Sequence, residues 1–145
     1  MTIEIVKAIK SRWDSKSLGS SVTGGLWHSR APEQQAMPYC VLTEVSAVNA
    51  GETRDNRLGR CEVQFDIYDD SGDAETSADL ATTVRNTFVN SHNAVAHYLN
   101  PTDISLVESR LSRDIVTQGV GYEQTFRSTF SIVFRYDEAA SRRPA

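Results

Sequence analysis

The densest group of potential metal ligands in this 145-residue sequence is the stretch IYDDSGDAET at residues 67–76. Its oxygens surround a glycine, which invites comparison with an EF-hand calcium loop, whose ligands occupy positions 1, 3, 5 and 12 with glycine at position 6. Counting from Asp69 places Ser71 and Asp73 at positions 3 and 5, but position 6 is Ala74 and position 12 is a leucine. The spacing excludes this loop. The acids are instead expected to end a strand and begin a helix.

The histidines and cysteines do not form a recognisable site. His92 and His97 are five residues apart, which on a helix turns them about 140° away from each other, so they cannot share a metal ion. His28 lies in an irregular segment and is expected at the surface. Cys40 and Cys61 fall in predicted strands and are expected to be buried free thiols. No catalytic residue and no metal site is predicted.

Two glycine-containing stretches could be mistaken for phosphate-binding loops. The run SKSLGSSVTGG at residues 15–25 lacks the Lys-Ser/Thr pair that follows the last glycine of a P-loop. Gly119 and Gly121 resemble the start of a dinucleotide fingerprint, but Gln124 replaces the third glycine and a strand is expected next. The first stretch is therefore interpreted as a loop and the second as a turn, and no cofactor is predicted.

Size and composition indicate one globular domain. Apolar residues make up 39% and charged residues 23%, and the net charge is −4, without a basic block that would attract nucleic acid or an apolar run that would span a membrane. No secretion signal is visible, so a cytoplasmic protein is expected. We expect a single α+β domain over residues 1–138 and a flexible C-terminal tail over residues 139–145.

Hydrophobic periodicity predicts two main helices and four strands. The helices are expected near residues 3–13 and 74–91, and the strands near residues 39–48, 60–68, 104–116 and 126–136. A helical spacing of four also fits residues 104–116, where a strand is favoured. A polar connection over residues 49–59 makes a long hairpin of the first two strands. The predicted fold is an antiparallel or mixed four-stranded sheet packed against the two helices.

The chain resembles the tail terminator (tail completion) proteins of long-tailed phages. The likeness is carried by Ala31-Pro32 through Pro38-Tyr39-Cys40-Val41-Leu42, by the segment VQFDIY at residues 63–68, and by residues 75–88 with their Leu-Ala and Val-Arg pairs. It implies a small subunit without catalytic residues, assembled as a ring, typically a hexamer. The ring would sit at the end of the tail tube, stop tube growth and offer a surface to the head.

The resemblance also implies the partners. They would be further copies of the chain, the tail tube protein and the head-tail connector proteins, with DNA passing through the ring unbound and no membrane contact. The protein would be found in the virion tail after assembly in the host cytoplasm. Unpaired sheet edges suit such self-association, because they can pair with neighbouring copies.

The polar hairpin supplies the candidate contact residues with the tube or a neighbouring subunit. They carry both signs of charge and too little apolar surface for a core: Glu52, Arg54, Asp55, Arg57 and Arg60. A solvated loop without a partner is the alternative interpretation of the same segment.

Two other functions fit parts of the sequence. A head-tail joining protein or a tube subunit would share a small sheet-and-helix domain. A small enzyme or ligand-binding domain could use Cys61, His92 or His97 with the acids of residues 69–75.

Overall fold

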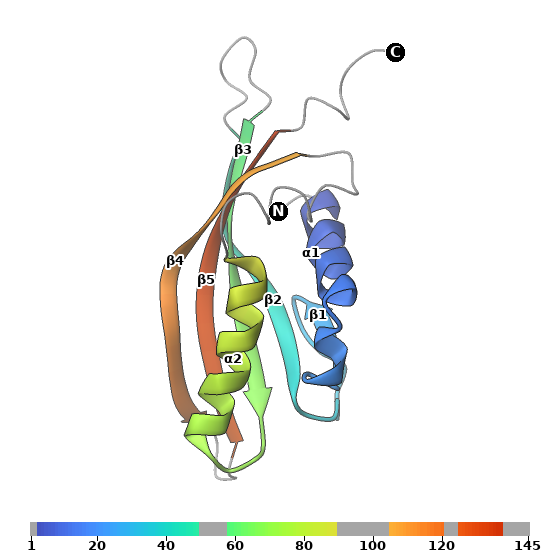
Figure 1. The fold of residues 1–145 in the computed structure, drawn as a ribbon, viewed down its shortest axis with the longest axis vertical. Coiled ribbons are helices and arrows are strands. Elements are labelled where there is room, and N and C mark those ends of the chain that lie inside the picture. Colours follow the sequence, from blue (N-terminus) through green and yellow to red (C-terminus); the bar gives the residue numbers. More distant parts are fainter. Residues whose placement is uncertain (1–2, 50–57, 90–104, 121–124, 138–145) are drawn as a thin grey trace.

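The computed structural model describes residues 3–49, 58–89, 105–120 and 125–137. The helices are α1 (Ile3–Ser15), the short 3-10 helix η1 (Leu18–Ser20) and α2 (Ala74–Phe88). The strands are β1 (Leu26–His28), β2 (Tyr39–Asn49), β3 (Leu58–Asp69), β4 (Ser105–Val120) and β5 (Thr125–Asp137). They form one sheet in the order β1-β2-β3-β5-β4, with α1 and α2 packed on the same side of it (Figure 1).

The observed sheet has five strands, so the predicted count of four is wrong by one, while the α+β class is confirmed. The missing strand is β1, which pairs in parallel with residues 40–42 of β2. Three residues are too few for an alternating pattern to be recognised. All other contacts between neighbouring strands are antiparallel. The ambiguous segment around residues 104–116 is a strand, as favoured, and Gly119, expected in a turn, is part of it.

The core lies between the sheet and the two helices. Strand β3 alternates strictly there, because every second residue from Cys61 to Ile67 is fully buried while the intervening residues point to the opposite side. Phe65 lies at the centre, stacked on Phe130 of β5 at a centroid distance of 4.9 Å and tilted against Phe88 of α2 at 5.3 Å. Helix α1 contributes Ile9 and Trp13. The helices thus cover one side, which leaves the other side of the sheet uncovered by any described helix.

The acidic turn after β3 starts α2, as the sequence predicted. Asp73 is the N-cap residue: its carboxylate accepts hydrogen bonds from the Glu75 N–H at 3.1 Å and from the Thr76 hydroxyl at 2.9 Å. Gly72 has a φ of 81°, a left-handed conformation that glycine adopts without steric penalty. Asp73 therefore has a structural role at the strand-to-helix junction.

Replacing Asp73 with alanine is expected to lower the free energy of unfolding by about 1 kcal/mol, because the helix loses its capping carboxylate. Urea denaturation followed by circular dichroism would measure the change. Asp70→Ala is the matched control, since Asp70 is an exposed acid of the same turn with no capping bond. Equal unfolding midpoints for the two variants would contradict the capping role.

Strand β4 is an irregular edge strand held to α2 by polar contacts. Its pairing with β5 shifts at three places, and the last shift sets Asp114 and Ile115 opposite the single residue Phe130. Ile115 packs against the core, whereas Asp114 forms an ion pair with Arg85 of α2 at 2.9 Å. The backbone N–H of Ile115, the largest cause, and the guanidinium of Arg85 both lower the pKa of Asp114. The bulge therefore lets two neighbouring residues point in different directions, so that Ile115 contacts the core while Asp114 contacts α2.

A chain of three hydroxyl groups also links α2 to β5 and to the edge strand β4. The Ser77 hydroxyl on α2 lies 3.1 Å from that of Ser128 on β5, which lies 2.8 Å from that of Thr117 on β4. Ser77 and Ser128 are completely buried. Buried hydroxyls need such partners, so these bonds fix the helix against both strands.

Candidate assembly surface

The described residues contain no cluster of side chains suited to bind a metal ion. No group of three or more His, Cys, Asp or Glu side chains among them could bind a metal ion. His28 is exposed, as expected, and His92 and His97 lie outside the described residues. No helix in the described part of the chain is long and apolar enough to cross a membrane.

The part of the enzyme interpretation that placed Cys61 together with the acids of the turn is wrong. Cys61 is fully buried and lies opposite Ala47, whereas Asp69 is at the far end of the same strand, about 27 Å away for eight strand residues. Cys40 and Cys61 are both buried free thiols, as predicted, and are separated along the sheet because Cys40 lies opposite Ile67. Burial raises the pKa of both thiols, and that of Cys61 reaches about 11.

Both thiols are expected to resist chemical modification in the folded protein. An increase in the pKa of Cys61 from 9.0 to about 11 lowers the reactive thiolate fraction roughly 100-fold at neutral pH, before steric shielding is counted. The rate of reaction with a chromogenic disulfide reagent, with and without urea, would measure this. The variants Cys40→Ser and Cys61→Ser separate the two thiols. A thiol that reacts equally fast in both conditions would show that its strand is open to solvent.

The side of the sheet that the helices leave uncovered carries many arginines. We call this surface the arginine face. Its charged members lie on β3, β4 and β5 and, by their strand register, share one side of the sheet. The described side chains there include five arginines and two acids: Arg60, Arg110, Arg113, Arg127, Arg135, Glu62 and Asp66. Positive charge therefore predominates among the described side chains of this face, although the whole chain has a net charge of −4.

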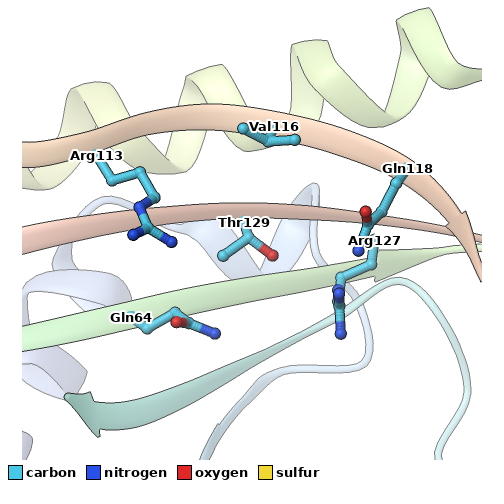
Figure 2. Close-up of a pocket in the computed structure, with 6 residues that line it drawn as sticks. All are labelled: Gln64, Arg113, Val116, Gln118, Arg127 and Thr129. Carbon is cyan, nitrogen blue, oxygen red and sulfur yellow. The ribbon is translucent and has the colours of Figure 1, made fainter.

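Part of the arginine face is hollowed to form a polar pocket of about 310 Å³. Figure 2 shows the lining side chains projecting from the same side of β3, β4 and β5, with α2 behind the sheet. We call this pocket the hollow. Its lining residues are Gln64, Arg113, Val116, Gln118, Arg127 and Thr129. Val116 is 56% exposed. The hollow thus presents cations, amides and a small apolar surface together.

The two arginines of the hollow are not neutralised from within the described chain. The nearby carboxylate of Asp66 accepts hydrogen bonds from uncharged donors, the Gln64 amide at 3.0 Å and the Thr129 hydroxyl at 2.6 Å. Neither Arg113 nor Arg127 makes a hydrogen bond or ion pair with another described residue. The Nε atom of Arg127 is buried and has no acceptor. A buried donor without an acceptor is unfavourable, so this site favours an anionic or carbonyl partner.

A surface of the opposite sign lies on the helix side of the sheet. We call residues 70–79 the acidic segment. Its four carboxylates, those of Asp70, Asp73, Glu75 and Asp79, are all exposed. None of them forms an ion pair with a described residue. Further along α2, by contrast, Arg85 is paired with Asp114. Negative charge is therefore concentrated at the start of the helix.

The outer edge of β4 is unpaired in the described structure. This strand of 16 residues ends the sheet, and only β5 pairs with it. A long unpaired edge is a template for pairing with another chain. At the opposite end of the sheet, the short strand β1 covers only residues 40–42 of β2.

The contact residues predicted from the sequence are only partly described. Arg60 is half-buried on β3, opposite Val48 and Arg135. The other four, Glu52, Arg54, Asp55 and Arg57, lie outside the described residues. The sequence reasoning missed the arginine face because its members are dispersed over three strands. The weak signal was the alternation of Arg127 and Arg135 with the aromatic core residues of β5.

Comparison with known proteins identifies a family and similar solved structures. Residues 7–136 match the model of a family described as "Tail completion protein gp17". The fold is similar to a chain in a solved structure described as "Virion of native gene transfer agent (GTA) particle", with a TM-score of 0.70 and 15% sequence identity. That alignment covers 89% of this chain and 91% of the other, and it concerns the fold alone. No curated protein matches the sequence.

Proposed function

We propose a role for this protein from the premise that the chain belongs to the tail completion protein gp17 family. Membership of this family makes it a structural component of a phage tail. This confirms the family predicted from the sequence. We propose that the protein forms a ring, most simply a hexamer, at the end of the tail tube. There it stops tube polymerisation and provides the surface to which the head attaches.

The observation that carries the ring proposal is the combination of an unpaired edge strand and an uncovered sheet face. Strand β4 leaves a row of backbone donors and acceptors without partners in the described structure. The arginine face beside it is hollowed at Arg113 and Arg127, which have no partner among the described residues. Exposed edges and charged faces of this kind are used in contacts between subunits. Assembly would take place in the host cytoplasm, before the head and tail join.

The hairpin between β2 and β3 is proposed to contact the tail tube. Glu52, Arg54, Asp55 and Arg57 lie between the two strands, and Arg60 begins the alternating part of β3. Mixed charges at the end of a hairpin suit a specific polar contact with a partner of complementary charge. Reversing the charges of Arg54 and Arg57 would test this, because unchanged ring formation and tail length would contradict docking by the hairpin.

Electron microscopy of particles made without this protein would test the proposed function. A terminator is required to stop tube growth, so its absence should give overlong tails, and expression of the protein from a plasmid should restore their length. Absence of all tails would indicate a tube subunit instead. Tails of normal length that fail to attach to heads would indicate a head-tail joining protein.

A further inference from the structure

We propose that the arginine face of one subunit binds the acidic segment of a neighbouring copy, with Arg113 and Arg127 receiving its carboxylates in the hollow. This inference rests on the proposed ring and specifies the contact that would hold it together. The partner is therefore a second copy of this chain, and the ligand chemistry is that of exposed aspartate and glutamate side chains.

The hydrogen-bond donors that line the hollow are of the kind that binds carboxylate groups. An arginine guanidinium presents a planar set of N–H groups that bind a carboxylate through two parallel hydrogen bonds. Arg127 has a buried Nε without an acceptor, and Arg113 has no partner among the described residues. Gln64 and Gln118 add amide groups at the rim, and the exposed Val116 adds an apolar contact. A neighbouring carboxylate would supply the acceptor that Arg127 lacks.

The acidic segment is the complementary surface on the same molecule. Its four carboxylates are exposed and make no ion pair within the described structure. The turn and the first helical turns hold them on a rigid support, because Asp73 caps α2. Complementary charges of this kind speed association and set the orientation of the two partners.

The two surfaces lie on opposite sides of the sheet, and this determines the type of assembly. Helix α2 covers one side (Figure 1), while the hollow opens on the other (Figure 2). A contact between them joins different surfaces of the two copies, so each subunit keeps one free surface of each kind. Such head-to-tail contacts form a closed ring when the rotations between successive subunits add up to one full turn. A symmetric dimer would not be expected from this contact.

Reversing the charge of either surface should break the contact, and reversing both surfaces together should restore their complementarity. The first variant is Arg113→Glu with Arg127→Glu, the second is Asp70→Arg with Asp79→Arg, and the third combines all four changes. Asp73 is left intact because it caps the helix. Arg30→Glu is the matched control, since Arg30 is exposed outside both surfaces. Thermal unfolding monitored by circular dichroism verifies folding, and Arg127→Gln provides a milder change.

Sedimentation velocity over a concentration series would measure self-association, and electron microscopy would measure tail length. We expect wild type and Arg30→Glu to form the same ring. Each double variant should associate at least roughly 30-fold more weakly, as loss of close charge pairs at interfaces does. The variant with four changes should recover most of the association, and Arg127→Gln should fall between wild type and the arginine double variant.

The possible failures are distinguishable. A folded Arg113→Glu, Arg127→Glu variant that forms rings as well as wild type overturns this contact and leaves the ring proposal intact. Loss of association in both double variants without recovery in the combined variant also overturns it. Loss of binding to a DNA duplex, with self-association unchanged, would assign the arginine face to nucleic acid instead. Wild-type protein that forms no ring in solution or on tails, and does not alter tail length, overturns both proposals.

Discussion

Phe65→Ala is expected to lower the free energy of unfolding by about 3–5 kcal/mol, the range measured for buried aromatic residues truncated to alanine. Phe65 is fully buried at the centre of β3 and contacts the rings of Phe130 and Phe88. Its removal would leave a cavity between the sheet and α2 and abolish both aromatic contacts. Because the free energy of unfolding of a native domain is about 5–15 kcal/mol, such a loss would remove a large part of the stability.

Urea denaturation would measure the effect of Phe65→Ala, at two protein concentrations because self-association raises apparent stability. Phe126→Ala is a matched control. It removes the same atoms from a half-buried position at the start of β5, so a smaller loss is expected. Equal losses for the two variants would show that Phe65 is not the centre of the core.

Gly24→Ala is expected to have the second large effect. The backbone N–H of Gly24 donates to the Pro38 carbonyl at 2.7 Å, and an added methyl group would lie 2.6 Å from the same oxygen. It would also clash with the carbonyl oxygen of Ala36. Both obstacles are backbone atoms, so the loop must move away from β2. Overpacking of this kind costs about 1–3 kcal/mol or more, and it should weaken the pairing of β1 with β2.

Gly19→Ala is the matched control for Gly24→Ala, because an added methyl group at Gly19 meets no atom within 4 Å. Denaturation midpoints would compare the two variants, and hydrogen exchange of the amides of residues 26–28 would report the pairing of β1. Faster exchange in Gly24→Ala alone is expected. Similar midpoints and exchange rates in both variants would contradict the close approach between the loop and β2.

Much of the fold was predictable because its central strands show a strong alternating pattern. In β3 and β5, one side meets the helices and the other side is uncovered, so apolar and polar residues alternate strictly from Cys61 to Ile67. The start of α2 was predictable because capping depends on a few neighbouring residues. Asp73 accepts from Glu75, as the local sequence indicates.

The remainder depends on contacts between residues far apart in the chain. Strand β1 has three residues and exists because the loop around Gly24 is held against Pro38. In β4, the bulge at Asp114 and Ile115 interrupts the alternation, which explains why a helical spacing also fitted that segment. The hollow joins side chains of β3, β4 and β5, such as Gln64 and Arg127. Their proximity follows from the strand order, which periodicity does not give.

The irregular register of β4 has a consequence for subunits that have not yet assembled. A smooth edge strand would accept almost any extended peptide, whereas bulges twist the edge and interrupt its regular row of donors and acceptors. Register shifts lie beside Arg113 and Val116, near the middle of the strand. Newly made monomers should therefore resist indiscriminate fibre growth and remain available in a crowded cell until a partner of matching shape arrives.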